Sequence, residues 1–260
     1  MVDSESREAF ACITARREHG VKSVDVEQPR LAIILRGKKQ VRCGAVQIDY
    51  APGDLFLMTA GCRLDVVNLP DPVEGLYLTV AIPFCDEVIA AARLLWARPV
   101  TQSDAKIAKF PLDQFERELL QWADAMTNRQ YVIARLALAA LAVRLCELGY
   151  TNLLVSPPPS LTARVRALVS EQPDRDWQSR DFEHEFGMSG ATLRRRLATE
   201  QTNLRDVIRA ARLACALDLL YTTRWPVKTI AAKVGYRSAP SFVHKFTERY
   251  GLEPAQIGNT

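Results

Sequence analysis

Two short stretches near the C-terminal end of the chain combine serine with cationic side chains. In the first, Ser189 precedes three consecutive arginines, Arg194–Arg196, and in the second, Arg237 and Ser238 precede Lys245. The planar guanidinium group of arginine can donate two parallel hydrogen bonds, either to a phosphate or to the O6 and N7 acceptors of guanine. Such side chains, when a helix carries them, are typical of proteins that bind nucleic acid.

The positive charge of the chain lies in its last hundred residues. From residue 160 onward there are 16 lysines and arginines against 11 acidic residues, and 13 of the 16 cations are arginine. The first 159 residues carry 18 basic and 19 acidic groups, so the formal charge of +4 comes from the C-terminal part. This excess favours a polyanionic partner for that part, although a mildly basic solvated surface would have the same composition.

The elements that position the first cationic stretch are two short helices with a glycine turn between them. Ser179 is the expected N-cap of a helix that runs through Phe186, and Gly187 permits a left-handed turn. Ser189 is the expected cap of a second helix, residues 190–200. This order predicts a helix-turn-helix, whose second helix enters the major groove of DNA.

The same order of residue types recurs after the second serine. Pro226 opens a helix, residues 234–236 (Val-Gly-Tyr) form the turn, and Ser238 caps a last helix that runs through Tyr250 to Gly251. The two capping serines are 49 residues apart. The pattern predicts a second helix-turn-helix.

A continuous helix from about Leu204 to Tyr221 is expected to join the two motifs. Its predicted apolar face consists of Ile208, Ala211, Cys215 and Leu219. A helix of ~18 residues spans ~27 Å, close to the ~34 Å between successive major-groove faces on one side of B-DNA. One rigid helix could therefore hold two recognition helices about one turn of DNA apart.

A proline run separates this helical part from the rest of the chain. Residues 156–160 (Ser-Pro-Pro-Pro-Ser) have the composition of a stiff, extended linker. We therefore expect one domain at residues 1–155 and another at residues 161–260.

The first domain combines strands with helices. Residues 30–82 contain several short strand patterns and a tight turn at Pro52-Gly53-Asp54, which predicts a small barrel or sandwich. Three helices are expected to follow, at Pro83–Trp96, Pro111–Met126 and Arg129–Leu148.

The third of these helices is apolar on two sides, so it must be covered twice. One stripe is the expected dimer interface: Val132, Leu136, Ala139 and Val143. The alternative is an ordinary helix held between two elements of the same chain.

Large apolar side chains of the strand region could line a pocket for a small effector or fill the barrel completely. The candidate effector-pocket residues are Phe56, Met58, Leu64, Leu76 and Leu78. The sequence leaves the two alternatives open.

The sequence offers little support for catalysis. The first half holds one histidine, His19, outside the strand region, so no histidine-based metal site is expected in a barrel. The whole sequence has no phosphate-binding glycine loop, no Gly-x-Ser-x-Gly motif and no paired-cysteine spacing. We therefore expect no enzyme activity, no cofactor and no metal. The acidic start, the lack of a long apolar run and six widely separated cysteines predict a cytoplasmic protein with no membrane contact.

The C-terminal residues resemble a known family. Residues 230–254, from Ile230 to Pro254, resemble the C-terminal signature of AraC-type transcription regulators of the AraC/XylS family. The residues that resemble the family's first helix-turn-helix and linker helix are Met188, Ser189, Leu193–Arg195, Leu197, Glu200, Arg212, Ala216, Leu219 and Leu220. Glu183, Gln201 and His244 stand where the family often has alanine, glycine and arginine.

The resemblance implies an α+β fold. An N-terminal small cupin-like β-barrel with a helical dimerisation pair would precede an all-α domain, in which a linker helix joins two helix-turn-helix units. It implies a sequence-specific transcription regulator that binds double-stranded promoter DNA. Activation is the usual mode in the family, so RNA polymerase becomes an expected partner.

The resemblance also implies a homodimer and control by a small effector. The alternative is a DNA-binding regulator whose N-terminal domain binds a partner protein or only self-associates, with no small-molecule ligand.

The predicted DNA contacts lie on the two recognition helices and at their starts. They are Ser189, Gly190, Ala191, Thr192, Arg194, Arg195, Arg237, Ser238, Ala239, Ser241, His244 and Lys245. We expect Arg195 to read bases, whereas the second helix, with fewer cations, should bind backbone more than bases.

Overall fold

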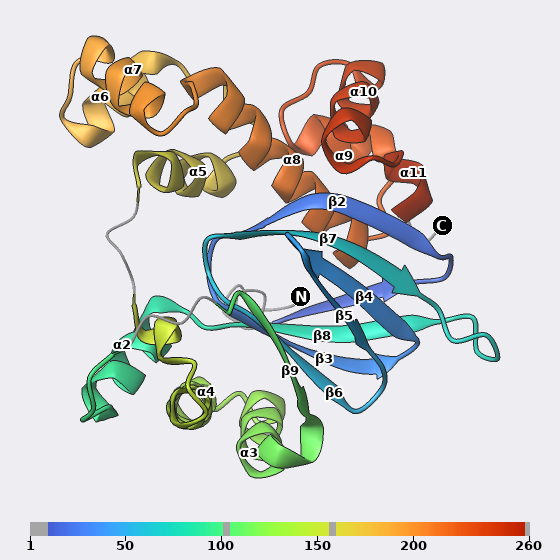
Figure 1. Cartoon of the computed structure of the whole chain (residues 1–260). Coiled ribbons are helices and arrows are strands. Elements are labelled where there is room, and N and C mark those ends of the chain that lie inside the picture. Colours follow the sequence, from blue (N-terminus) through green and yellow to red (C-terminus); the bar gives the residue numbers. More distant parts are fainter. Residues whose placement is uncertain (1–9, 101–104, 156–159, 258–260) are drawn as a thin grey trace. The chain divides into compact units, whose positions relative to one another are not determined.

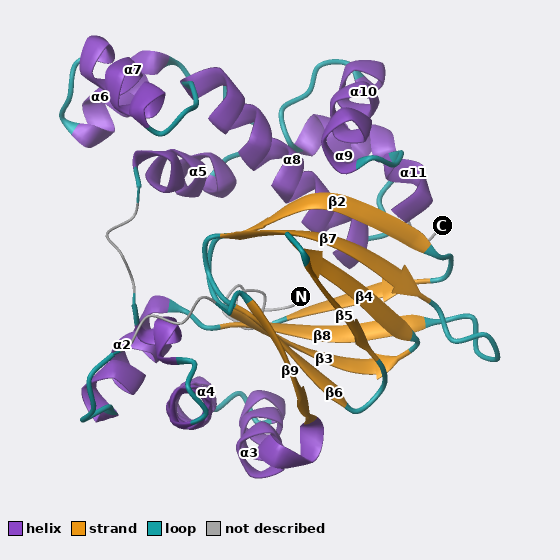
Figure 2. Ribbon diagram, viewed as in Figure 1, coloured by secondary structure: helices purple, strands orange, loops and turns teal. Residues whose placement is uncertain are grey.

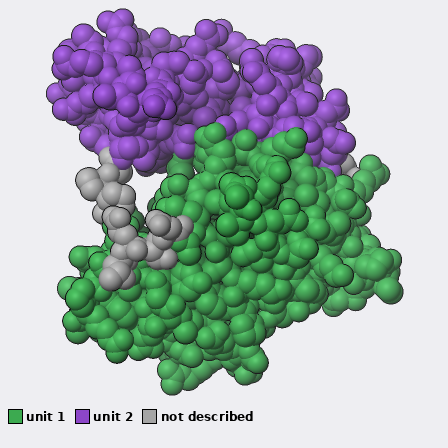
Figure 3. Space-filling model, viewed as in Figure 1, with its two compact units in different colours: residues 1–156 green, residues 157–260 purple. Residues whose placement is uncertain are grey.

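The computed structural model describes residues 10–100, 105–155 and 160–257. The chain divides into two compact units, residues 1–156 and residues 157–260, which Figure 3 draws in different colours. We call them the N-terminal unit and the C-terminal unit. Residues 156–159 of the expected linker and the acidic start of the chain lie outside the described residues.

The N-terminal unit contains two antiparallel sheets (Figures 1 and 2). One sheet has five strands in the order β1-β8-β3-β6-β9, and the other has four in the order β2-β7-β4-β5. The strands are β1 Ala11–Ala15, β2 His19–Val26, β3 Arg30–Arg36, β4 Lys38–Cys43, β5 Val46–Tyr50, β6 Asp54–Met58, β7 Cys62–Leu69, β8 Tyr77–Pro83 and β9 Ile107–Pro111. The helical elements are α2 Asp86–Leu95, η1 Leu112–Phe115, α3 Glu116–Thr127, α4 Tyr131–Glu147 and η2 Thr151–Leu154.

The two faces of the five-stranded sheet have different partners. Leu31 pairs with Leu57 and Ile82, and this set belongs to the core that the sheet shares with α2, α3 and α4. Ala32 pairs with Phe56 and Ala81, and alternation places this set on the opposite face. That face meets the four-stranded sheet, because the rings of Tyr50 in β5 and Phe56 in β6 lie 4.5 Å apart.

The structure corrects several boundaries predicted for this unit. Strands β1, β2 and β9 lie outside the predicted strand region. Pro83 and Pro111 end strands β8 and β9 rather than begin helices, and α2 and α3 start at Asp86 and Glu116. The fixed φ of proline suits an extended strand end as well as a first helical turn, so proline alone could not distinguish the two.

The described residues of the C-terminal unit form helices and no strands. Its helices are α5 Leu161–Glu171, α6 Ser179–Phe186, α7 Gly190–Thr199, α8 Leu204–Thr222, α9 Val227–Lys233, α10 Ala239–Tyr250 and α11 Pro254–Ile257. The predicted α+β class, with strands confined to the N-terminal part of the described chain, is confirmed. Figure 1 shows α6 and α7 near one end of α8 and α9 and α10 near the other. We call α6–α7 the first motif and α9–α10 the second motif.

The helix caps agree with the sequence in two of three cases. Ser189 Oγ accepts a hydrogen bond from the Thr192 amide, and Ser238 Oγ accepts one from the Ser241 amide. The third expected cap, Ser179, is wrong, because Gln178 is the N-cap of α6. The amide of Gln178 donates to the carboxylate of Asp181 at 2.7 Å, and this capping box places the helix start one residue earlier.

Helix α8 buries a different stripe from the predicted one. Ala211 is buried as expected, but Ile208 and Leu219 are half-buried, whereas Val207 and Leu220 are almost fully covered. The helix packs against α5 and also against α9 and α11, so its buried face turns along its length.

Candidate nucleic-acid interface

Helix α7 is the candidate recognition helix of the first motif. Leu193 and Leu197 are completely buried in its core, so the opposite face of the helix points to solvent. At ~100° per residue, Arg195 lies opposite the midpoint of these two leucines. It therefore projects directly away from the core, whereas Arg194 and Arg196 lie on the flanks; all three are exposed.

The first turn of α7 is fixed by side-chain hydroxyls. Ser189 Oγ accepts from the Thr192 amide at 3.3 Å, and the two hydroxyl oxygens lie 3.1 Å apart. Ser189 and Thr192 therefore set the start of the helix, and Ala191, which is exposed, lies beside Arg195 on the outward face.

Gly190 serves packing between the two helices of the motif. A Cβ at this position would lie 2.6 Å from Oε1 of Glu183 in α6. The Glu183 carboxylate also accepts a hydrogen bond from Ser179 Oγ at 2.7 Å. The bulky Glu183, which departs from the family pattern, thus fits because its neighbour is a glycine.

Helix α10 is the candidate recognition helix of the second motif. Phe242 and Phe246 are completely buried, and Ser241 and His244 are exposed on the opposite side. Glu248 follows His244 by one turn on the same outward face. The sequence reasoning missed this acidic residue, although its helical spacing from His244 could have revealed it.

The lysine of α10 is paired with an acidic residue at the surface. Lys245 Nζ donates to the Glu248 carboxylate at 2.6 Å, and this hydrogen bond lowers the pKa of Glu248. Such surface pairs contribute little to stability, so a phosphate can replace Glu248 as the partner of Lys245. The acidic neighbour nevertheless reduces the positive potential of α10, whereas α7 carries three arginines and no acidic residue.

Three other predicted contacts lie at the start of α10. Arg237 and Ser238 are exposed, and Ser238 caps the helix. Ala239 is half-buried, and it lies one turn before Phe242 on the side that faces the core. The structure therefore brings Arg237 but not Ala239 to the outward surface.

Two exposed cations outside the recognition helices were also missed. Arg180 lies in the first turn of α6, and Lys228 lies in the first turn of α9. Cations at the start of the leading helix of such a motif can contact backbone phosphates, which position the protein without reading sequence.

A carboxylate joins the end of α7 to the start of α5. Glu200, the C-cap of α7, accepts hydrogen bonds from the amides of Leu161 and Thr162, both at 2.9 Å. Burial raises the pKa of Glu200, but the hydrogen bonds from Thr162 and Leu161 outweigh this effect and lower it overall. The charged carboxylate thus satisfies two amide groups that a helix start leaves unpaired.

The predicted effector-pocket residues do not all face one interior. Phe56, Met58 and Leu64 are buried between the two sheets. Leu78 alternates with Tyr77 along β8, so it lies on the face opposite Phe56, and Leu76 precedes the strand and is half-buried. The prediction that Leu78 and Phe56 line the same space is wrong, because the period-two alternation was not applied across the sheet.

A polar cluster lies in this interior instead. Lys39 Nζ donates to Asn68 Oδ1 at 2.7 Å, and Asn68 Nδ2 lies 3.4 Å from His19 Nε2. Lys39 Nζ also lies 5.5 Å from the ring centroid of Tyr77. Burial lowers the pKa of Lys39 to about 7. The placement of His19 outside the strands was wrong: it begins β2 and is buried.

The predicted dimer stripe on α4 is exposed at one end only. Val132 is 69% exposed and Leu136 is 55% exposed, but Ala139 is 1% exposed and Val143 is half-buried. Ala139 belongs to the core that α4 forms with α2 and α3. Its inclusion in the interface was wrong, because α4 turns this position toward its own unit.

The described residues contain no group of three or more histidine, cysteine or acidic side chains that could hold a metal ion. Among the same residues, no helix is long and apolar enough to span a membrane.

The sequence comparisons concern the C-terminal unit. Residues 183–259 match a family model described as a helix-turn-helix domain. The chain is 28% identical over 108 residues to the transcriptional activator CsvR of Escherichia coli, covering 42% of this chain and 40% of CsvR. It is 25% identical over 111 residues to the virulence regulon transcriptional activator VirF of Shigella flexneri, covering 43% and 42%. The chain thus spans about two-fifths of these relatives, which are transcription regulators and not enzymes.

The comparison with solved structures covers nearly the whole chain. Apo ToxT K231A from Vibrio cholerae superposes with a TM-score of 0.67 at 12% identity, covering 95% of both chains. Wild-type ToxT bound to an unsaturated fatty acid gives a TM-score of 0.66 at 13% identity, covering 95% of this chain and 94% of ToxT. This likeness shows a common fold.

Proposed function

We propose that this chain is a sequence-specific DNA-binding transcription regulator, because it carries a helix-turn-helix domain of the AraC/XylS type. The observation that supports this most is the pair of capped, solvent-facing helices α7 and α10 near the two ends of α8. Arg195 projects outward from the first of them with no acidic partner on its own helix.

The two motifs divide the work of binding. Arg195 on α7 reads a guanine edge in the major groove, and Arg194 lies beside it at the phosphates. On α10, Arg237, Ser241, His244 and Lys245 contact mainly backbone, because Glu248 lowers the positive potential there. The first motif therefore supplies most of the sequence preference.

Selection from a randomised DNA pool tests this proposal without knowledge of the regulated genes. The full chain should enrich duplexes with two conserved segments about 10 bp apart, since successive major-groove faces repeat at that distance. Binding should weaken steeply with salt as counterions compete. Enrichment of no sequence, with retention that falls to zero at physiological salt, would contradict the proposal.

Activation is the proposed mode, with RNA polymerase as the partner, because CsvR and VirF are named as activators. We further propose a homodimer in which Val132 and Leu136 of α4 meet the same surface of a second copy. Their exposure leaves two large apolar side chains on one helix face without a partner among the described residues.

A small acidic effector is proposed for the N-terminal unit. Lys39 is 7% exposed and has no carboxylate partner among the described residues. A ligand carboxylate beside Lys39 would favour its charged form and complete the polar cluster with Asn68. Unsaturated fatty acids are the first class to test, because ToxT, which shares the fold, has been solved with such a ligand.

Binding of such an effector can be tested by thermal unfolding of the full chain with oleate, and with the methyl ester of oleate as the control. Ligand at ~100 times its dissociation constant stabilises the folded state by ~2.7 kcal/mol. Lys39→Met should abolish the shift. No shift with a panel of carboxylic acids would favour the alternative, in which this unit only self-associates or binds a protein.

A further inference from the structure

One arginine connects both motifs to the helix between them. Arg212 lies in the middle of α8, and its Nε donates to the carbonyl oxygen of Pro173 at 2.9 Å. Its Nη2 donates to the carbonyl oxygen of Arg175 at 2.7 Å, and Nη1 donates to that of Gly235 at 3.4 Å. Pro173 and Arg175 belong to the loop before α6, whereas Gly235 belongs to the turn between α9 and α10.

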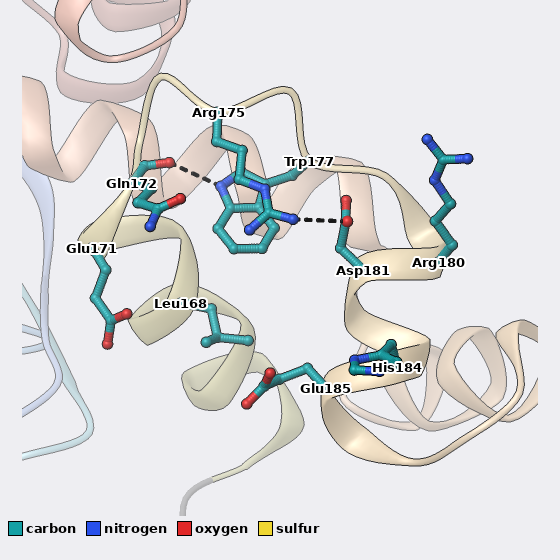
Figure 4. A pocket seen from close by; sticks show the side chains of 9 residues that line it. All are labelled: Leu168, Glu171, Gln172, Arg175, Trp177, Arg180, Asp181, His184 and Glu185. Atoms are coloured by element: carbon teal, nitrogen blue, oxygen red, sulfur yellow. Dashed lines mark hydrogen bonds and ion pairs between the residues drawn. The ribbon is translucent and has the colours of Figure 1, made fainter.

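The loop before α6 is held by side-chain contacts, which Figure 4 shows. Trp177 Nε1 donates to the carbonyl oxygen of Gln172 at 2.9 Å, and the Arg175 guanidinium stacks 4.3 Å from the Trp177 ring centroid. Arg175 also pairs with Asp181 in α6 at 2.9 Å. A displacement of the loop by Arg212 would therefore carry the start of α6 with it.

The turn of the second motif touches the same loop. Gly235 has φ +79°, and a Cβ there would lie 2.7 Å from the carbonyl oxygen of Pro173 and 2.9 Å from the Arg212 guanidinium. The turn of the second motif thus lies against the backbone of the loop that leads into the first motif, and Arg212 of α8 contacts both.

The apolar cluster of the first motif does not extend to the second motif. The cluster around α5, α6 and α7 includes Val207 and Ala211 of α8 and, among the described residues, none from α9 or α10. The polar junction is therefore a separate link between the motifs, in addition to the continuous backbone of α8.

We propose that Arg212 is a positioning residue that fixes the rotation of the second motif relative to the first, and so sets which half-site spacing the protein accepts. This inference rests on the proposed DNA binding. The three donor atoms of the Arg212 guanidinium point to backbone carbonyls, so Arg212 acts through the motifs and not on the DNA. A lysine has one point charge and cannot reach three acceptors in a fork.

The test uses the full chain and the bipartite duplex that wild type selects. A second duplex carries 5 bp inserted between the two segments, about half a helical turn. Wild type should prefer the selected duplex by about 100-fold, because the second motif then binds within the same complex. Arg212→Met should keep affinity for a duplex with only the first segment but lower the spacing preference to about 5-fold.

The control variant is Arg205→Met, an exposed arginine in the first turn of α8 that makes no hydrogen bond or ion pair with the loop or the turn among the described residues. It should leave the spacing preference unchanged. Arg212→Lys should give an intermediate spacing preference. If the methionine variant does not fold, the lysine variant tests the inference in its place. Amide hydrogen exchange at residues 174–177 and 235–237 should accelerate in both Arg212 variants.

The outcomes separate the two proposals. A wild-type preference for one spacing that both folded Arg212 variants retain would overturn this inference and leave DNA binding intact. Failure of wild type to enrich any sequence would overturn the proposed function and this inference with it, whereas enrichment of one segment alone would overturn only this inference. Equal losses on all duplexes in Arg212→Met would identify a purely structural role and would also overturn it.

Discussion

At the scale of single residues, the two candidate recognition helices differ in what their cations can do. Arg195 has no acidic neighbour on α7, whereas Lys245 is paired with Glu248. Arg195→Ala should relax the base preference at one position by about 1–3 kcal/mol. Lys245→Ala should weaken binding by a similar factor on every duplex.

These two variants can be compared by titrating each protein against single-base variants of its selected duplex. Glu248→Gln is the matched control, because it frees Lys245 from its partner and should tighten binding evenly. Equal losses across all duplexes for both alanine variants would show that the division of roles is wrong.

The buried lysine of the N-terminal unit makes stability depend on pH. Burial lowers the pKa of Lys39 to about 7 from 10.5, so the unfolded chain binds a proton that the folded chain releases. Stability should therefore rise by about 1.4 kcal/mol per pH unit between pH 7 and pH 9. Above pH 9 the trend should weaken, since burial raises the pKa of the Cys146 thiol to about 11, and the unfolded thiol ionises first.

Urea unfolding of the full chain at pH 7, 8 and 9, monitored by circular dichroism, measures how the free energy of unfolding changes with pH. Lys39→Met should be more stable at pH 7 and should lose most of the pH dependence. A variant with the wild-type slope would show that Lys39 is not the titrating group.

Some single-residue roles could be inferred from the sequence and others could not. Helical periodicity separates Arg195 from Leu193, because each must take opposite sides of α7. Two contacts depend on side-chain rotamers and on packing between helices: the ion pair of Lys245 with Glu248, and the packing of the Glu183 side chain against Gly190. The polar cluster of Lys39 joins strands that are distant in sequence, so no local pattern shows it.

At the scale of elements, the glycines of the two turns are not equivalent. Gly187, the turn of the first motif, has φ +60° and open space where a Cβ would lie. Gly235, in the turn of the second motif, has φ +79° and the carbonyl of Pro173 in that place. Gly187→Ala should cost about 1 kcal/mol, and Gly235→Ala should cost about 3 kcal/mol or more, because a steric clash adds to the backbone strain.

Thermal unfolding of both variants, with the full chain, gives this comparison. The Gly235 variant should also lose the spacing preference for DNA, whereas the Gly187 variant should keep it. Equal destabilisation of the two would show that the contact with Pro173 relaxes at no cost.

The elements of the C-terminal unit could be predicted better than those of the N-terminal unit. Serine caps, glycine turns and apolar periodicity are local signals, and together they placed α7, α8 and α10 to within about two residues. Gln201, at φ +57°, takes the left-handed conformation at the point where the family often has glycine. Strands β1, β2 and β9 were missed because their partners, not their own residues, make them strands.

At the scale of the whole molecule, the proposed dimer depends on two exposed side chains of α4. Leu136→Glu should weaken self-association by at least about 10-fold, because a carboxylate would be buried in an apolar contact. Ala139→Glu, at a position 1% exposed, should instead unfold the N-terminal unit. Sedimentation velocity of the full chain distinguishes these effects.

The control for the dimer is Val73→Glu, since Val73 is 91% exposed and belongs to the loop before β8 and not to α4. It should sediment as wild type does. A wild type that is monomeric at all concentrations would remove α4 as the interface.

The resemblance to AraC-type regulators, drawn from motifs in the last hundred residues, is confirmed by the matching helix-turn-helix model and by the relatives. The overall fold of the N-terminal part is confirmed by the likeness to ToxT at 12% identity. Sequence reasoning could reach this part only coarsely, because a barrel tolerates many residues at each inward position provided that the alternation is kept.

The bonds between Glu200 and the first two amides of α5 have a mechanical consequence. Ser160 directly precedes Leu161 and Thr162, whose amides both donate to the carboxylate of Glu200, the C-cap of α7. Tension on the polypeptide at this point would act on the Glu200 carboxylate, which caps the end of the candidate recognition helix α7. We therefore expect a pull on this part of the chain to reach α7 through two hydrogen bonds, without passing through α8.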